Sequence, residues 1–122
     1  MRKYSQLKMK KMKIIPLESD FKGEGEVKGF SFSRLLEGEK TYLYEVKDTD
    51  EHVWYEVIKR FSTPIVIDFK KKILSNDTMR ERYPKAKDFG SKGWSLLSLR
   101  EAVIKFNEIE NEKTKDDESN EA

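Results

Sequence analysis

The chain of 122 residues contains no cysteine and only one histidine. The lack of cysteine excludes disulfides, thiolate metal sites and cysteine nucleophiles, and removes any reason to place the chain in an oxidising compartment. With His52 alone, a histidine-based metal site is excluded and a Ser-His-Asp triad has a single candidate base. His52 borders a predicted hairpin turn, where a solvated polar residue is expected, so we predict no metal site and no cofactor.

Long apolar runs are also absent. The basic N-terminus is followed only by the apolar residues 14–17, too few for a secretory signal, and no run approaches the ~18 apolar residues of a membrane span. We therefore expect a cytoplasmic protein without a membrane partner. Apolar residues make up 36% of the chain and charged residues 39%. The core must be thin and offers little material for a catalytic cleft, so we expect no enzymatic activity.

A net charge of +2 hides an uneven distribution. Residues 1–13 carry six Lys and Arg and no acid, whereas residues 108–122 carry seven acids against two lysines. The sequence therefore predicts a flexible basic arm over residues 1–13, a single α+β domain over 14–111 and a disordered acidic tail over 112–122. Met1, Met9 and Met12 all remain open as translation starts.

Aromatic and β-branched residues alternate with others in three runs, residues 30–33, 42–47 and 53–57, separated by turns at 37–39 and 48–51. This period of two predicts a three-stranded antiparallel meander. Centring the second turn between Thr49 and Asp50 pairs Val46 with Val53, Tyr44 with Tyr55 and Tyr42 with Val57. Centring the first turn on Gly38 places Phe32 opposite Tyr44 and Phe30 opposite Val46. One apolar face would then span all three strands.

Two further strands and one main helix are predicted. Residues 65–69 resemble a fourth strand, at a sheet edge because Pro64 has no N–H to donate, and residues 94–97 a fifth. Asn76 and Asp77 predict the cap of a short helix that ends before Pro84. Ser98 and Glu101 form a capping box, and the following apolar residues recur at helical spacing: Leu99, Ala102, Val103, Phe106 and Ile109. The expected fold is an antiparallel sheet of four to five strands with one C-terminal helix across its aromatic face, ending by about residue 111.

Three short motifs are better explained without catalysis. Residues 88–90 spell the magnesium motif of kinases, but the other kinase motifs are missing. Residues 90–93 lack the spacing of a phosphate-binding loop and precede a strand instead of a helix. Asp48, Asp50 and Glu51 lack the twelve-residue loop of a calcium site and indicate an acidic hairpin turn.

The segment of residues 80–94 combines basic and aromatic side chains, as follows: Arg80, Arg82, Tyr83, Lys85, Lys87, Phe89, Lys92 and Trp94. Such a mixture suits single-stranded nucleic acid, because cations contact phosphates and rings stack on bases. The alternative is that the rings pin a long loop to the core and the lysines are solvated. The three lysines at 70–72 would either extend this patch or protect an edge strand from aggregation.

The Tyr-Glu-Val strands, Tyr83-Pro84, residues 88–90, Trp94 and the closing helix together resemble small uncharacterised proteins of phages and mobile elements of Bacteroidota-like bacteria. The resemblance covers about residues 12 to 110, implies an accessory role and transfers no site residue. We expect a non-enzymatic interaction protein that binds and modulates a protein partner. The alternative is a nucleic-acid-binding module that uses residues 80–94 and the basic arm. If Leu43, Trp54 and Ile58 were exposed together, they would form a candidate protein interface or dimer surface.

Overall fold

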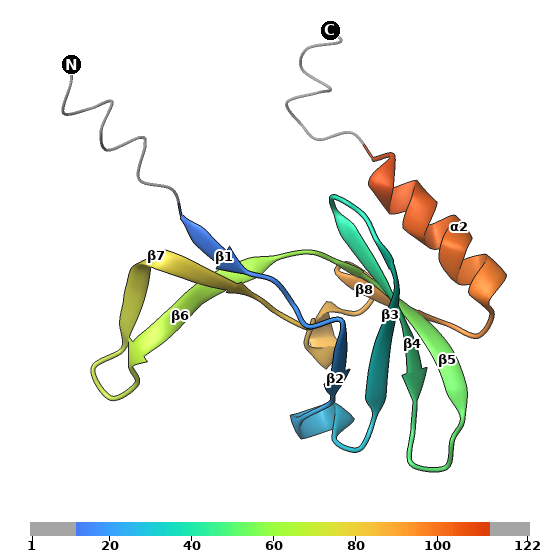
Figure 1. Cartoon of the computed structure of the whole chain (residues 1–122), viewed down its shortest axis with the longest axis horizontal. Helices are drawn as coiled ribbons and strands as arrows, with labels where there is room; N and C mark the ends of the chain where they lie inside the picture. Colours follow the sequence, from blue (N-terminus) through green and yellow to red (C-terminus); the bar gives the residue numbers. More distant parts are fainter. Residues whose placement is uncertain (1–11, 113–122) are drawn as a thin grey trace, which may run out of the picture. The chain divides into compact units, whose positions relative to one another are not determined.

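A computed structural model describes residues 12–112 (Figure 1), so most of the predicted basic arm and acidic tail lies outside the described residues. Where the sequence predicted one domain, the chain forms two compact units. The hairpin unit comprises the described parts of Met1–Leu17 and Phe61–Tyr83, and the helix unit those of Glu18–Arg60 and Pro84–Ala122. Each unit has its own sheet.

The helix unit contains a five-stranded antiparallel sheet in the order β2-β3-β4-β5-β8 and one α-helix. Its elements are β2 (Asp20–Lys22), η1 (Gly25–Val27), β3 (Ser31–Glu37), β4 (Thr41–Lys47), β5 (Val53–Lys59), η2 (Ala86–Asp88), β8 (Gly93–Leu96) and α2 (Leu99–Glu110). The predicted fold class is confirmed, with β3, β4 and β5 as the meander. The three-residue strand β2 was not predicted, because so short a strand shows no period.

The predicted register of the second hairpin is wrong by one residue. Val46 pairs with Trp54 and Tyr44 with Glu56, so the hairpin centres on Asp50. Glu51 adopts a left-handed conformation (φ 65°). Asp48 Oδ1 accepts hydrogen bonds from the N–H groups of Asp50 and His52, each at 2.9 Å. These features fit one more residue into the turn than predicted, and a slip of one residue moves every side chain of β5 to the other face.

The first hairpin departs from its predicted register by two residues, so its faces are as predicted. Phe32 pairs with Val46, and Arg34 pairs with Tyr44. A bulge between Arg34 and Leu36 then shifts the register before the turn. Because the side-chain period of a strand is two, Phe32 still lies on the same face as Tyr44.

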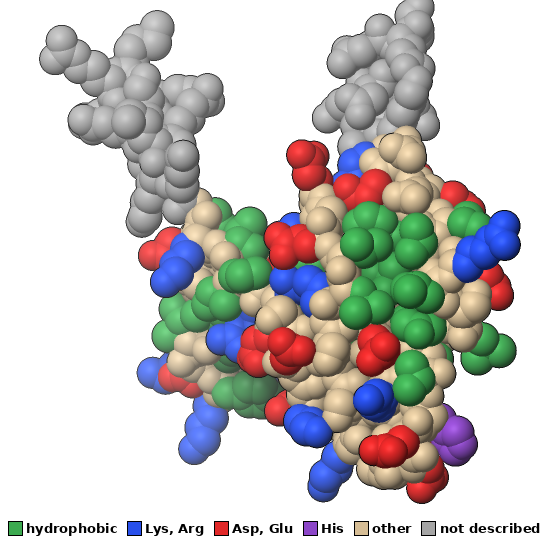
Figure 2. All heavy atoms as spheres, turned by 45° about the vertical axis from the view of Figure 1, so that its right-hand side comes forward, with side chains coloured by type: hydrophobic (Ala, Val, Ile, Leu, Met, Phe, Trp, Pro, Cys, Tyr) green, Lys and Arg blue, Asp and Glu red, His purple; other side chains and the backbone are tan. Residues whose placement is uncertain are grey.

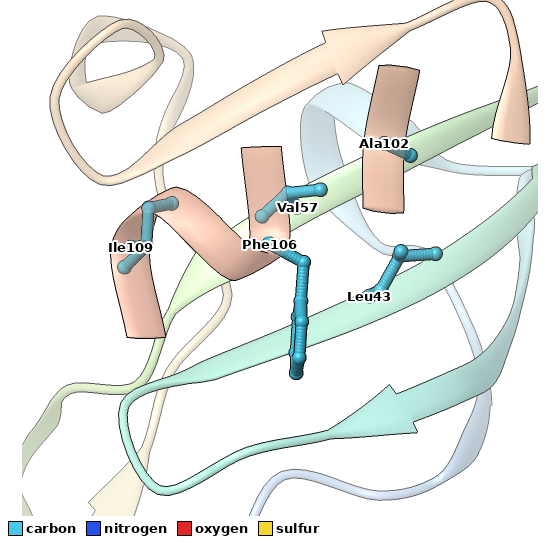
Figure 3. Close-up of a cluster of buried hydrophobic side chains, with 5 residues drawn as sticks. All are labelled: Leu43, Val57, Ala102, Phe106 and Ile109. Carbon is cyan, nitrogen blue, oxygen red and sulfur yellow. The ribbon is translucent and has the colours of Figure 1, made fainter. Parts of the chain in front are cut away.

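Helix α2 packs on the face of the sheet that carries Leu43 and Val57, opposite the aromatic face where it was predicted (Figure 3). Leu43, Val57, Ala102, Phe106 and Ile109 form a buried cluster, with Tyr55, Trp94, Leu96 and Val103 packed against it. The capping box is confirmed, because Ser98 Oγ accepts a hydrogen bond from the Glu101 N–H at 3.1 Å. This cap and the apolar stripe fix the start and the buried side of the helix.

The C-terminal end of α2 is tied to the β3–β4 turn. The Glu110 carboxylate accepts the N–H groups of Glu39 (3.0 Å) and Lys40 (2.8 Å). A Cβ at Gly38 would lie 2.3 Å from this carboxyl carbon, so only glycine admits the approach. Desolvation alone would raise the pKa of Glu110. The pKa nevertheless lies below its ordinary value, because the nearby Thr41 hydroxyl and the two N–H groups stabilise the charged carboxylate more than desolvation destabilises it. The Thr41 hydroxyl lacks full hydrogen-bond geometry.

The opposite face of the sheet is aromatic. Phe21 stacks on Phe32 with ring centroids 4.5 Å apart, and the guanidinium of Arg34 lies 3.9 Å from the Tyr42 ring centroid. Desolvation alone would lower the pKa of Arg34, but hydrogen bonds to the Tyr44 hydroxyl and nearby negative charge raise it above its ordinary value. Ile58 is buried and Trp54 half-buried on this face, whereas Leu43 is buried under α2. The three residues therefore do not form the joint exposed surface that was considered.

The hairpin unit is a three-stranded sheet in the order β1-β7-β6, built from β1 (Lys13–Ile15), β6 (Ser62–Asp68) and β7 (Ile73–Glu81). β1 runs parallel to β7, and β6 is an edge strand, as predicted from Pro64. The predicted helix after Asn76 is wrong, since this segment pairs with β6 within β7. Ser75 Oγ instead accepts the N–H groups of Asp77 and Thr78, at the point where the β6–β7 register shifts.

Within residues 12–112, no helix has the length and apolar composition needed to cross a bilayer. Strands dominate the secondary structure of the described residues, and α2 is the single α-helix among them.

Candidate interaction surface

The predicted segment of residues 80–94 is divided between the two units, because their boundary lies between Tyr83 and Pro84. Arg80, Arg82 and Tyr83 belong to the hairpin unit, and the other five candidates belong to the helix unit. Arg80 is exposed in β7. Arg82 is half-buried, and its Nε donates to Thr63 Oγ1 at 2.8 Å, so this guanidinium is partly engaged in holding β6 to the end of β7.

In the helix unit, Lys85, Lys87 and Lys92 are exposed on the loop before β8. The loop is ordered by backbone hydrogen bonds, with the Asp88 carbonyl accepting the N–H groups of Ser91 (3.1 Å) and Lys92 (2.8 Å). The Lys92 carbonyl accepts the Lys59 N–H at 2.8 Å, which fastens the loop to the end of β5.

None of the three rings of the predicted segment is fully exposed: Tyr83, in the hairpin unit, is half-buried, and the two rings of the helix unit pack against that unit. Trp94 is half-buried against the cluster under α2, and Lys105 Nζ lies 4.4 Å from its ring centroid. Phe89 is half-buried, and a Cβ built on Gly93 would lie 3.2 Å from its ring. Packing of both rings against their own unit favours the loop-pinning interpretation of these two residues.

The hairpin unit has a feature that the sequence reasoning missed. Among its described residues no apolar side chain is buried, and the only buried residues are Ser75 and Glu81. Its exposed large apolar residues are Met12, Ile14, Val66, Ile67, Phe69, Ile73 and Leu74. Figure 2 shows hydrophobic side chains at the surface of this unit, on the left of the view, with Lys and Arg side chains among them.

Both faces of the outer part of the hairpin are uncovered. Ile73 and Leu74 are consecutive in β7, so their side chains point to opposite faces, and they are 45% and 53% exposed. Val66, the partner of Leu74 in β6, and Ile67, at the register shift that follows it, are also exposed. An alternating strand with one covered face would expose only every second residue, which is not the pattern here.

The turn between β6 and β7 presents an aromatic ring beside three lysines. Phe69 is 85% exposed and is followed by Lys70, Lys71 and Lys72, all exposed. Asp68 Oδ1 accepts the Lys71 N–H at 3.1 Å, and Lys72 adopts a left-handed conformation (φ 56°). The sequence interpretation placed Phe69 inside a strand. The run of lysines after it was the signal of a turn.

The two units carry opposite net charge. Among the described residues, 12–17 and 61–83 contain six Lys and Arg against three acids, a net charge of +3. Residues 18–60 and 84–112 contain 12 Lys and Arg against 16 acids, a net charge of −4. The described parts of the two units therefore differ in the sign of their net charge.

The three acids of the hairpin unit are engaged within it. Asp68 accepts the Lys71 N–H, Asp77 accepts the Ser75 hydroxyl at 2.9 Å, and buried Glu81 accepts the Leu17 N–H at 2.9 Å. The exposed cations of the hairpin unit are not engaged in this way. Within residues 12–112 the side chains of Lys13, Lys70, Lys71, Lys72 and Arg80 form no hydrogen bond or ion pair. Positive charge is thus available for an external partner.

The acidic turn of the β4–β5 hairpin brings carboxylate oxygens of Asp48 and Asp50 and a ring nitrogen of His52 within 4.8 Å of one another. Asp48 Oδ2 lies 3.0 Å from His52 Nδ1, and Oδ1 accepts two backbone N–H groups. Desolvation alone would raise the pKa of Asp48, but the hydrogen bonds from His52 and Asp50 hold it below its ordinary value. Closure of the turn accounts for this cluster without a metal ion.

No protein-family model, curated protein or solved structure matches this chain. The candidate surface is therefore defined by its own residues, and we name the exposed apolar side chains Ile14, Val66, Ile67, Ile73 and Leu74 the apolar surface of the hairpin unit.

Proposed function

We propose that this chain is a non-enzymatic interaction protein that binds a protein partner through the apolar surface of the hairpin unit. The observation that carries this proposal is the absence of any buried apolar side chain among the unit's described residues. An accessory role of this kind is what the resemblance to phage and mobile-element proteins implies.

Physical stability supports the proposal. A small sheet needs a covered hydrophobic face to be stable on its own, and the hairpin unit has exposed apolar side chains instead. Its five defining apolar residues are each between 45% and 66% exposed. Covering this surface would stabilise the unit at about 25 cal/mol per Å² of apolar area.

The composition of the surface matches a protein interface. Interface centres are depleted in charge and surrounded by polar residues. Val66, Ile67 and Leu74 carry no charge, and exposed Lys13 and Arg80 lie one residue from Ile14 and Met79 in β1 and β7. A flat polyanion would use the cations but leave the aliphatic side chains uncovered.

Photo-crosslinking tests this proposal. A benzophenone amino acid replaces Ile67 in one variant and Leu97, an 87% exposed residue of the helix unit, in the control. Both are irradiated in extracts of the source cells with and without nuclease treatment, and the adducts are identified by mass spectrometry. We expect a discrete protein adduct from position 67 only, and loss of binding to that purified protein on Ile67→Ser but not on Leu97→Ser. Identical adducts from both positions, or an adduct abolished by nuclease, would refute the proposal.

A further inference from the structure

We infer that the β6–β7 turn is a second binding site, which takes single-stranded nucleic acid through Phe69 and Lys70, Lys71 and Lys72. This site adjoins the apolar surface of the hairpin unit but consists of other residues, and it does not depend on the protein partner. It also differs from the nucleic-acid site predicted over residues 80–94, where Phe89 and Trp94 pack against the helix unit.

The ring at this turn is placed for stacking. Phe69 is 85% exposed, the highest exposure of any aromatic residue among residues 12–112. The turn around it is ordered, because Asp68 accepts the Lys71 N–H and the Phe69 carbonyl accepts the Lys72 N–H at 3.4 Å. Every base has a π-face, so an exposed ring on an ordered turn can stack on any unpaired base. Paired bases in a duplex are already stacked and offer no free face inside the helix.

The charges at the turn supply the phosphate contacts. Three consecutive exposed lysines follow the ring, and their side chains make no hydrogen bond or ion pair within the described residues. Asp68, the acid nearest to them in sequence, is engaged with the Lys71 N–H. The described residues of the surrounding unit have a net charge of +3, which attracts a polyanion over a longer range. Cations beside an exposed ring form the combination that single-strand binders use.

Fluorescence anisotropy with a labelled oligo(dT) of about 20 nucleotides tests the site on the full chain, over a series of salt concentrations. Replacing Lys70, Lys71 and Lys72 together by Gln should weaken binding and reduce the log–log salt slope by about 2, since each single-strand phosphate contact contributes about 0.7. The same triple replacement at Lys85, Lys87 and Lys92 tests the rival site. The inference would be overturned if the variant at Lys85, Lys87 and Lys92 lost as much salt slope as the variant at residues 70–72, or more.

Stacking is tested separately from charge. Phe69→Ala should weaken oligo(dT) binding by about five- to 150-fold with little change in salt slope, and Leu97→Ala, its exposed control, should not. Heparin, a polyanion without bases, should bind Phe69→Ala and the parent equally. Equal weakening of heparin binding, tighter binding to duplex than to single strands, or binding to anionic vesicles without binding to oligo(dT) would each overturn the inference.

These outcomes are distinguishable from failure of the proposed protein interaction. Ile67→Ser should abolish binding to the purified protein partner and leave oligo(dT) binding near the parent value, while the triple variant at Lys70, Lys71 and Lys72 should do the reverse. Circular dichroism confirms that each variant is folded, which is expected because every substituted side chain is exposed.

Discussion

Replacing Phe106 by Ala removes the largest α2 side chain of the cluster that joins the helix to the sheet. Phe106 is 9% exposed and packs with Leu43 and Val57 of the sheet. Truncation of a buried phenylalanine to alanine costs about 3–5 kcal/mol, through lost apolar burial and the cavity that remains. Ala102 and Ile109 flank this position on the same face of α2 and cannot fill it without moving the helix. We therefore expect a loss of about 4 kcal/mol, a large part of a typical domain stability of about 5–15 kcal/mol.

Urea denaturation followed by tryptophan fluorescence measures this loss, because Trp94 packs against the same cluster. Leu99→Ala is the matched control. Leu99 lies on the predicted stripe but is 45% exposed, so its truncation should cost less than about 1 kcal/mol. A Phe106→Ala protein within about 0.5 kcal/mol of the parent would show that α2 does not pack on the Leu43 face.

Three further changes probe local contacts. Ser98→Ala should cost about 1 kcal/mol in urea denaturation through loss of the helix cap, whereas Ser98→Asp should retain most of it. Glu51→Gly should raise stability by up to about 1 kcal/mol, because glycine adopts a φ of 65° without strain, and a loss would show that the turn does not need this conformation. Glu110→Gln should destabilise at neutral pH by about 1 kcal/mol. Since the folded pKa of Glu110 lies below its ordinary value, its contribution is present above about pH 4.3 and lost as the pH falls through the folded pKa, so the two denaturation midpoints should converge in acid. A difference that grows on acidification would contradict the assigned carboxylate contacts.

Features set by neighbouring residues were predictable from the sequence. The capping box at Ser98 and the apolar stripe of α2 require only residues within one helix, and both are confirmed. The strands of the meander were found for the same reason, since alternation is a local pattern. Pro64 marked an edge strand because its missing N–H restricts any pairing it enters.

Features that depend on backbone conformation or distant pairing were not predictable. The left-handed conformation of Glu51 was not predicted, so the predicted β4–β5 register was wrong by one residue. With that register, α2 was predicted on the wrong face of the sheet. Asn76 and Asp77 are residue types that often cap a helix. In the structure they lie within β7, where the Ser75 hydroxyl accepts the N–H groups of Asp77 and Thr78. No local pattern shows that β1 pairs in parallel with β7, more than sixty residues along the chain.

The candidate site was predicted only in part. Arg80 and the lysine run at 70–72 were noted from composition, and both are exposed in the hairpin unit. The division of residues 80–94 between two units depends on contacts that composition does not reveal. The exposure of Val66 and Ile67 was hidden for the same reason, because a run of apolar residues ordinarily indicates a buried strand.

Hydrogen exchange measured by mass spectrometry on the free protein tests most directly the claim that the hairpin unit lacks a core of its own. Amide protection reflects local stability, so strands without buried apolar contacts open at low free-energy cost. We predict that amides of β6 and β7 exchange about a hundredfold faster than those of β4 and β5, whose side chains at Leu43 and Val57 are buried. Protection of β6 and β7 equal to that of β4 and β5 would contradict the claim and, with it, the proposal that an external partner covers this surface.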